Sequence, residues 1–528
     1  MARLKKRYWI PSLILLIIVI LSLYGWRYWL SFKDEHNLSI DWQGIDIGLG
    51  GLSFDELTIS QQPQLSLKAS NVKLSLSTFT AKSIDIYWSD STEKSGLPKV
   101  TDTPELNQSS PNSSTVSTII YWLPNNINVD SLTFYQQKKE LVNLKVQATK
   151  DQNTIQLNLS SNNQHTLTAN LSFDQLNSCF EIKEGVLTTS LNQFGIEKGN
   201  LTLPFTGVLT SDKVILKSSD NAFFNIEKAK FSDDLIVKPL AGKLIFEVTI
   251  PISLESKQIN AKSTLTITKF DGIFKASEFK SAVGNIDISF NNNQFTISTP
   301  ALTIQQVNIG VNFEKIRLAG SYSASLNALN KGLVKWTKAQ AAIFSGLVFL
   351  DQGQLNLAKL PQQFNLRLKK IQLKDILAKY PADGLAGNGA IDGTLPITLL
   401  PSSKKGTAFN EVVIKNGQLV TVNEGYLQFE NTALKNYAQA NPNMKILTDI
   451  IKNFHYTKLS GMVSYQNEIA KLGLNIQGNN RDVENGKAVN LNINLEENIA
   501  KLLISLQLSD QINEPIRKRI EAYLKRKS

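Results

Sequence analysis

Hydrophobic and polar residues alternate strictly in the stretch from Val489 to Glu496. Every second residue is Val, Leu or Ile, and the residues between them are Asn or Glu. A period of two places the apolar side chains on one face of an extended strand and the polar side chains on the other. A second apolar run from Leu502 to Leu508 follows the short polar turn at Glu497 and Asn498. The pattern predicts two strands joined in an antiparallel hairpin.

The same alternation recurs back to residue 57, so most of the protein is predicted to be one-faced β-sheet. Leaving one exposed Leu or Ile in water forfeits roughly 1.5–3 kcal/mol, and a second sheet or helices usually cover such a face. The sequence offers few amphipathic helices, so we expect a mainly β protein with a long, curled, largely antiparallel sheet that forms an apolar groove. The candidate groove residues, taken from the clearest alternating runs, are Leu65, Leu67, Val72, Leu74, Leu76, Ile155, Leu157, Leu159, Ile286, Ile288, Phe290, Val489, Leu491, Ile493, Leu495, Leu502, Ile504, Leu506 and Leu508.

A long apolar segment near the N-terminus predicts a single transmembrane helix over residues 8–30. About 20 residues span a bilayer core, and aromatic residues stand at both ends of this segment, as they do at membrane interfaces. A cleavable signal peptide is the alternative, but bulky aromatic residues rather than small ones follow the apolar run. The basic tail at residues 1–7 predicts a cytoplasmic N-terminus, with the chain after the helix on the opposite side of the membrane. The candidate anchor residues are Trp9, Leu13, Leu16, Val19, Leu23, Trp26 and Trp29.

Composition divides the remaining chain into an elongated β-groove over residues 31–509 and a C-terminal segment over residues 510–528. Within the groove, residues 89–117 are rich in Ser, Thr, Asn and Pro and predict a flexible polar loop. The C-terminal segment carries an apolar stripe with basic residues elsewhere, which predicts a basic amphipathic helix. Two interpretations of this helix remain open: it packs on the last strand, or it touches a membrane.

A few short helices are predicted in the C-terminal third. One covers Leu373–Tyr380 and ends before Pro381, after a short strand at Phe364–Leu368. Thr432–Phe454 has the pattern of a helix pair around the Asn-Pro sequence at 441–442. The segment Leu326–Gly346 is compatible with a helix or with strands, and we favour strands.

The net charge of +11 is concentrated at the two ends of the chain. Four basic residues precede the apolar N-terminal segment, and residues 514–528 hold six Lys or Arg against two Glu. The body between them is close to neutral, which argues against a nucleic-acid-binding surface. Basic ends suit contact with anionic lipid headgroups, although short basic ends also simply keep a chain soluble.

Residues with the spacing of a catalytic, cofactor or metal site do not stand out. His36, His165 and His455 are far apart, and the lone Cys179 is flanked by apolar residues, which favours a small core side chain over a nucleophile. The glycines of the segment 384–389 superficially resemble a dinucleotide loop, but alternating strand residues follow them, not a helix. We therefore expect no cofactor, no metal and no enzymatic activity.

The C-terminal region over residues 355–509 resembles the YdbH family, one of the AsmA-like protein families of Gram-negative bacteria. The segments that carry the resemblance occur in the family's order: Ile371–Leu377, Gly387–Pro396, Ile414–Leu419, Ile451–Tyr456, Gly486–Asn498 and Leu502–Leu508. The resemblance implies a bridge that is anchored in the inner membrane, with its bulk in the periplasm, and that moves phospholipids to the outer membrane along an apolar β-groove. It also implies a small outer-membrane lipoprotein as a partner near the C-terminal end.

The physics of lipid transfer agrees with this resemblance. Exposing two acyl chains to water at about 0.8 kcal/mol per CH₂ costs on the order of 20 kcal/mol, and an uninterrupted apolar track removes that barrier. Some 30 strands lying across a rod, each adding about 4.8 Å, would give about 150 Å of length. Two alternatives remain: a structural or scaffold protein of the envelope, and an anchored β-solenoid enzyme acting on envelope polymers.

Overall fold

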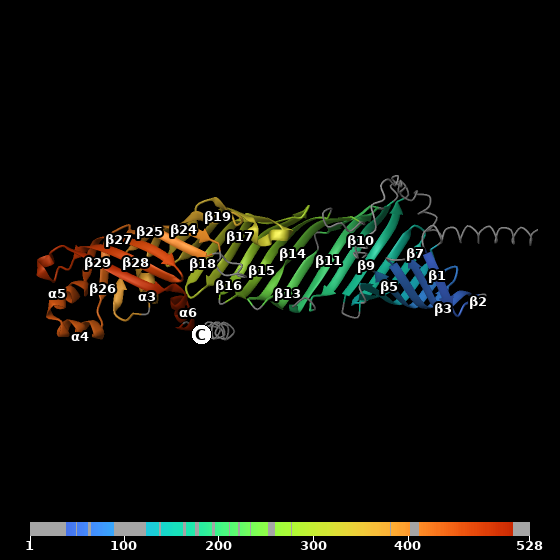
Figure 1. Ribbon diagram of the computed structural model, residues 1–528, viewed down its shortest axis with the longest axis horizontal. Helices are drawn as coiled ribbons and strands as arrows, with labels where there is room; N and C mark the ends of the chain where they lie inside the picture. Colours follow the sequence, from blue (N-terminus) through green and yellow to red (C-terminus); the bar gives the residue numbers. More distant parts are fainter. Residues whose placement is uncertain are drawn as a thin grey trace, which may run out of the picture. The chain divides into compact units, whose positions relative to one another are not determined.

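The computed structural model describes residues 38–88 and 123–509, apart from gaps at 49, 62–64, 137–138, 162–164, 175–178, 193–195, 211, 220–221, 233, 252–258, 276, 381 and 402–410. Within these residues the protein is mainly β, with long antiparallel ladders and a few short helices, as predicted (Figure 1). The predicted transmembrane helix, the polar loop at 89–117 and the segment 510–528 lie outside the described residues. Among the residues that the structure describes, no helix is long and apolar enough to cross a membrane.

The chain divides into two units, of which the first comprises residues up to Thr189 together with Leu203–Lys213. Its strands pair in chain order, with β1 and β2 both on β3. Among the described residues, the pairs from β1 to β10 are antiparallel except β5–β6, which is parallel. The parallel pair falls where residues 89–125 connect β5 to β6. The strands are β1 (Leu38–Gln43), β2 (Asp46–Gly48), β3 (Gly51–Gln61), β4 (Leu65–Leu74), β5 (Thr78–Trp88), β6 (Asn126–Gln136), β7 (Lys139–Asp151), β8 (Thr154–Ser161), β9 (His165–Asp174) and β10 (Cys179–Ser190).

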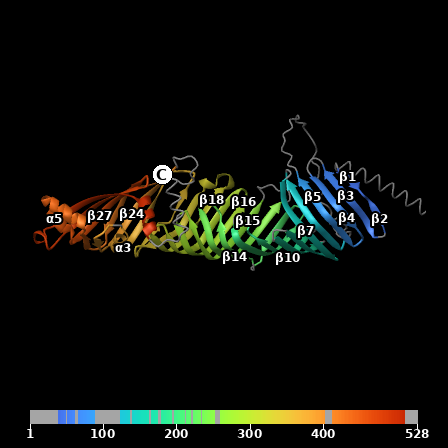
Figure 2. The same cartoon turned by 90° about the horizontal axis from the view of Figure 1, so that it is seen from below.

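The second unit comprises Ser190–Thr202 and the chain from Val214 onward. Its ladder is antiparallel from β13 to β29, and β14 to β18 lie side by side in both views (Figure 1, Figure 2). Strands β11 (Ile196–Leu209) and β12 (Lys213–Ser218) carry residues of both units. The others are β13 (Phe223–Lys230), β14 (Leu235–Pro251), β15 (Asn260–Phe274), β16 (Ser277–Asn291), β17 (Gln294–Asn308), β18 (Asn312–Ser325), β19 (Leu333–Ile343), β20 (Gly346–Leu350), β21 (Gly353–Asn356), β22 (Gln362–Gln372), β23 (Leu385–Gly387), β24 (Ala390–Leu400), β25 (Glu411–Thr421), β26 (Gly425–Phe429), β27 (Phe454–Gln466), β28 (Ile469–Asn479) and β29 (Val489–Asn498).

Irregularities within the long strands keep the apolar side chains on one face. In β17 the register shifts between Thr299 and Leu302, and in β19 it shifts between the residues paired with Ala319 and Gly320. An inserted residue reverses the alternation of side chains, so apolar residues at odd positions before the bulge and at even positions after it share a face. In β4 the pattern changes phase between Leu67 and Val72 without a register shift, at Asn71, which has a φ of 47°.

The short helices confirm most of the sequence predictions. Helix α3 (Leu373–Lys379) and the pair α4 (Thr432–Ala440) and α5 (Pro442–Ile451) occupy the predicted segments. The segment that was compatible with helix or strands forms the 3₁₀ helix η2 (Leu326–Lys331) followed by β19, which confirms a strand for most of its length. A second short 3₁₀ helix, η3, covers Glu484–Gly486.

Two predictions about local structure are wrong. The run from Leu502 to Leu508 is not the second strand of a hairpin, because residues Ile499–Ser509 form helix α6. Ile499, Leu502, Leu503 and Leu506 recur at helical spacing, and the Asn498 side chain accepts a hydrogen bond from the Lys501 N–H at 2.9 Å, as a helix N-cap does. Leu76 lies in the turn between β4 and β5, where it is fully exposed and not part of a strand.

Candidate functional site

A row of paired residues crosses the strands of the second unit from β14 to β21. Residues that pair across an antiparallel ladder lie on the same face of the sheet. Each residue of the row pairs with the next: Phe246, Ser263, Ile288, Ile297, Tyr322, Val334 and Leu355. Ser263 is the one small polar residue among them. We call the face that carries this row the apolar face, and the opposite face the polar face.

A cavity of about 360 Å³ opens on the apolar face between β14 and β17. Most of its lining residues are aromatic or aliphatic and come from four strands and from η2: Phe246, Val248, Ala261, Ile288, Phe290, Phe295 and Leu326. Lys262 and Ser263 of β15 also border it. Ile288 and Phe290 are half-buried, and Leu326 is 43% exposed. These side chains are packed against one another but remain open to solvent, which is how an apolar surface able to receive an apolar ligand is built.

The apolar face continues from β19 toward the C-terminal strands. Because of the bulge in β19, Ala341 shares a face with Val334. From Ala341 a second row crosses the ladder to its last strand, and it alternates between large side chains and small residues: Ala341, Val348, Leu368, Gly393, Leu419, Gly461, Leu474 and Ile493. At both glycines a Cβ would approach neighbouring Leu side chains to 2.6–3.1 Å. Small residues are therefore required where the large ones crowd together.

Short helices cover part of the apolar face near the C-terminal end. Helix α3 supplies Leu373, Ile376 and Leu377 to a cluster with Ile371 and Ile391. Helix α5 supplies Ile450 to a second cluster that contains fully buried side chains of β27 and β28: Phe454, Tyr456, Leu459 and Ile476. The apolar face is thus a closed core at these two places and an open surface around the cavity.

The first unit carries an equivalent apolar row. It runs through successive paired residues of β5 to β10, all of them aliphatic: Ala81, Val129, Val146, Leu159, Leu167 and Leu187. A second row on β1 and β3 to β7 joins Ile40, Ile59, Leu67, Ile86, Phe134 and Val142. In β8 the half-buried Ile155, Leu157 and Leu159 alternate with exposed polar residues. This unit therefore has one apolar face as well.

Apart from Leu76 in the β4–β5 turn, the structure distributes the predicted groove residues over four settings. Leu67, Val72, Ile155, Leu157 and Leu159 lie on strands of the first unit, with Leu65 in β4 and Leu74, 41% exposed, at its end. Ile286, Ile288 and Phe290 lie on β16, and the last two line the cavity. Val489 and Leu491 pack against the α5 cluster, whereas Ile493 and Leu495 of the same strand are 36% and 47% exposed. Leu502, Ile504, Leu506 and Leu508 belong to α6, and the predicted anchor residues lie outside the described part of the chain.

Several residues of the cavity were not among the predicted groove residues. Phe246, Val248 and Phe295 belong to strands whose alternation is visible in the sequence, so the same criterion could have found them. Leu326 is different, because it reaches the cavity from a 3₁₀ helix, and no strand pattern indicates such a contribution. Periodicity identifies the strands of the face but not the elements that fold over it.

Helix α6 joins opposite edges of the sheet in the second unit. It begins beside the β27–β28 turn, where the Ile499 N–H donates to the Glu468 carbonyl oxygen at 2.9 Å. Through the antiparallel register, that turn lies on the edge opposite to the β17–β18 turn at residues 309–311. Yet a Cβ at Gly310 would lie only 2.4 Å from the Leu503 carbonyl oxygen. The two edges of the sheet therefore approach each other at α6.

Titratable groups play little part on the apolar face. No group of three His, Cys, Asp or Glu side chains able to hold a metal ion occurs in the described ranges. Cys179 is buried, as predicted, and this burial raises the pKa of its thiol, which keeps it protonated and unreactive. Burial also raises the pKa of Tyr456, whose hydroxyl donates to the Asn388 carbonyl oxygen at 2.7 Å. Both groups act in packing.

The fold defines a class: a mainly β protein with a long, largely antiparallel sheet, in which each unit presents one apolar face. The profile of the YdbH-like family, described as "Intermembrane phospholipid transport protein YdbH", matches residues 248–521, which is more than half of the chain. The chain belongs to the YdbH-like family. Comparison with curated proteins and comparison with solved structures give no match. The family is thus one of intermembrane phospholipid transport, and a large β-sheet with one apolar face is consistent with that role.

Proposed function

We propose that this protein is a bridge along which phospholipids pass between the inner and outer membranes, with their acyl chains on the apolar face. The observation that carries the proposal is the uninterrupted row from Phe246 to Leu355 beside an open apolar cavity. A phospholipid that crosses water exposes two acyl chains at a cost on the order of 20 kcal/mol. A continuous apolar track lowers this barrier and leaves the headgroup in water.

The proposal includes the membrane attachments that the sequence predicts. The segment 8–30 anchors the protein in the inner membrane with a cytoplasmic N-terminus, and the body lies in the periplasm. The basic segment 510–528 contacts anionic headgroups or packs on the sheet, and a small outer-membrane lipoprotein is a partner at the C-terminal end. The sequence pattern, the charge distribution and the resemblance to the family support these assignments.

Photocrosslinking tests the track directly. A photoreactive amino acid at Ile288, which lines the cavity, should become covalently joined to phospholipid in cells. The matched control is the next residue, Asp287, which is exposed and forms a hydrogen bond with Thr264 at 2.7 Å on the polar face. Lipid captured at position 288 but not at 287 supports the proposal. Equal capture at both positions, or none at 288, contradicts it and favours a scaffold.

A further inference from the structure

A second, larger cavity lies on the polar face of the second unit. It has a volume of about 820 Å³ and spans β20, β22, β24, β25, β27, β28 and β29. Its polar and charged lining residues alternate with the row from Leu368 to Ile493 and project from the opposite face, although Leu368, Gly393, Leu419, Gly461 and Leu474 of the row also border the cavity. The size falls within the range of about 300–1,000 Å³ typical of ligand sites.

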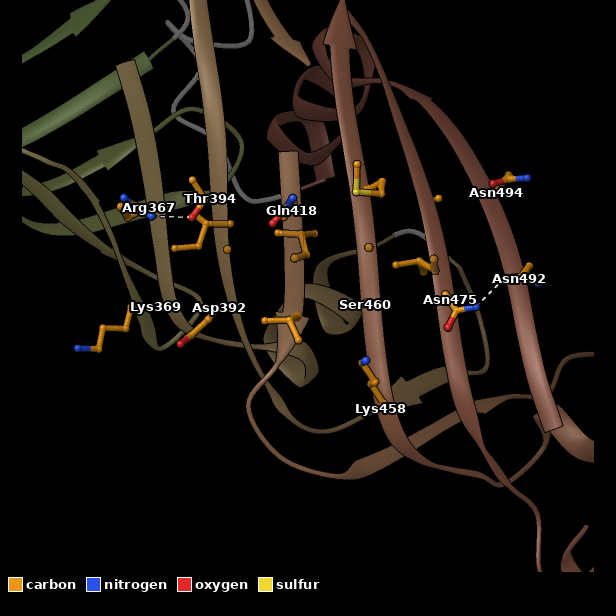
Figure 3. A pocket seen from close by; sticks show the side chains of 18 of the residues that line it. Arg367, Lys369, Asp392, Thr394, Gln418, Lys458, Ser460, Asn475, Asn492 and Asn494 are labelled. Carbon is orange, nitrogen blue, oxygen red and sulfur yellow. Dashed lines mark hydrogen bonds between the residues drawn. The ribbon is translucent and has the colours of Figure 1, made fainter. Parts of the chain in front are cut away.

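Four side-chain amides and two hydroxyls line this polar cavity, together with charged side chains, glycines and apolar side chains (Figure 3). The Asn475 amide donates to Asn490 and to Asn492, each at 2.9 Å, so neighbouring amides hold one another in place. Figure 3 shows Asn475 directed toward Asn492 and Arg367 directed toward Thr394. Each amide still offers donors and acceptors on its free positions. Such a surface suits a ligand that carries many hydroxyl groups.

The charges of the polar cavity are unbalanced toward the positive. Arg367, Lys369 and Lys458 line it, against the single carboxylate of Asp392. Asp392 is engaged by the Lys370 backbone N–H at 2.7 Å, and Arg367 pairs with Asp351 at 2.9 Å. Within the part of the chain that the structure describes, Lys369 and Lys458 form no ion pair. Two exposed ammonium groups therefore remain to meet a negatively charged ligand.

Apolar side chains complete the lining. Val420 is 45% exposed and Met462 is 50% exposed, although both stand on the polar face among amides. They offer apolar contact to a ligand whose rings have C–H faces. We propose that the polar cavity binds an acidic oligosaccharide, a chain of hydroxyl-bearing sugar rings that carries carboxylates. The amides meet its hydroxyls, Lys369 and Lys458 meet its carboxylates, and Val420 and Met462 contact its ring faces.

Isothermal titration of the full chain in detergent with tetragalacturonate, an oligosaccharide of uronic acids, tests the proposal. Maltotetraose serves as the neutral probe, inorganic phosphate as the small anion, and anionic phospholipid vesicles as the lipid probe. We expect tetragalacturonate to bind at least about tenfold more tightly than maltotetraose and not to be displaced by equimolar phosphate. Equal binding of the neutral probe, binding of phosphate or vesicles alone, or no binding at all would overturn the proposal.

Variants locate the binding to this cavity. Lys369→Gln combined with Lys458→Gln should weaken tetragalacturonate binding about tenfold or more, and Asn492→Asp should weaken it by repulsion without a change of size. Lys335→Gln on β19 removes an exposed charge outside the cavity and serves as the control. Unchanged binding in the double variant refutes the assignment. Lipid capture at Ile288 should be the same in all of these variants, so the outcome is independent of the lipid track.

Discussion

Two Asp side chains stabilise irregular backbone positions of neighbouring strands by the same contact. Asp271 accepts a hydrogen bond from the Ser281 N–H at 2.6 Å, and Asp392 accepts one from the Lys370 N–H at 2.7 Å. Ser281 and Lys370 have φ angles of 53° and 52°, in the left-handed region. At such a position the backbone N–H leaves the regular ladder, and the carboxylate of the neighbouring strand satisfies it. These two positive-φ positions within long strands therefore depend on specific polar partners.

This contact gives a prediction at the residue scale. Asp271→Ala should lower the free energy of unfolding by about 1–2 kcal/mol, because it removes a charge-assisted hydrogen bond and leaves the N–H without its acceptor. Ser281→Gly should change it by less than about 0.5 kcal/mol, since glycine adopts a positive φ without strain. Urea denaturation measures both variants. An equal loss in the two would show that the side chain of Ser281, not its backbone contact with Asp271, matters.

A second prediction concerns Tyr456, which is 1% exposed. Burial raises its pKa above the ordinary value near 10, so the folded protein keeps the phenol proton to higher pH than the unfolded chain does. Its stabilising effect is complete below about pH 10 and is lost as the pH rises through the folded pKa. The difference in unfolding free energy between wild type and Tyr456→Phe should therefore stay constant up to about pH 10 and shrink at higher pH. A difference that stays constant at higher pH as well would contradict this, and the exposed Tyr380→Phe is the control.

At the scale of elements, the position of helix α6 against the β17–β18 turn depends on one glycine. Gly310 has a φ of 106°, and a Cβ there would lie 2.4 Å from the Leu503 carbonyl oxygen. Gly310→Ala should displace α6 from the β17–β18 turn, and backbone hydrogen exchange over residues 499–509 should become at least about tenfold faster. Gly50→Ala is the matched control, because nothing lies within 4 Å of its added Cβ. Unchanged exchange in Gly310→Ala would mean that α6 is held by other contacts alone.

Strands were predictable from the sequence because a half-apolar strand has a strict period of two. This criterion located β4, β8, β16 and β29 and gave the correct fold class. It failed at α6, where Leu and Ile satisfy a period of two and a helical period at once over a short run. The N-cap at Asn498 favours a helix over a strand in this segment, and its effect depends on a single hydrogen bond.

The candidate site was predictable only in its composition. Ile288 and Phe290 could be assigned to an apolar face, but the cavity that they line also needs Leu326 from a 3₁₀ helix. Val489 and Leu491 have the same pattern and yet pack under α5, because a helix from elsewhere in the chain covers them. Which part of an apolar face is covered depends on tertiary packing, and the periodicity of a strand does not predict that packing.

At the scale of the whole molecule, both units present apolar rows that cross many strands without a charged residue. The row in the first unit is wholly aliphatic from Ala81 to Leu187, and the row in the second includes only Ser263 as a polar member. A folded core alone needs no such continuity, since separate clusters would bury the same area. Transport along the face requires it, because every acyl chain must pass every strand.

A single charged substitution in the middle of the apolar row therefore distinguishes a transport function from a scaffold function. Ile288→Asp places a carboxylate among Phe246, Phe290 and Phe295, where an acyl chain would have to pass it. A charge in contact with acyl chains cannot keep its hydration, and this cost raises the barrier by several kcal/mol. We expect phospholipid transfer to fall at least about tenfold. Ser289→Asp adds the same charge on the polar face of the same strand and should transfer lipid normally. If Ile288→Asp folds and transfers lipid at the wild-type rate, lipids do not follow this face and the scaffold alternative gains support.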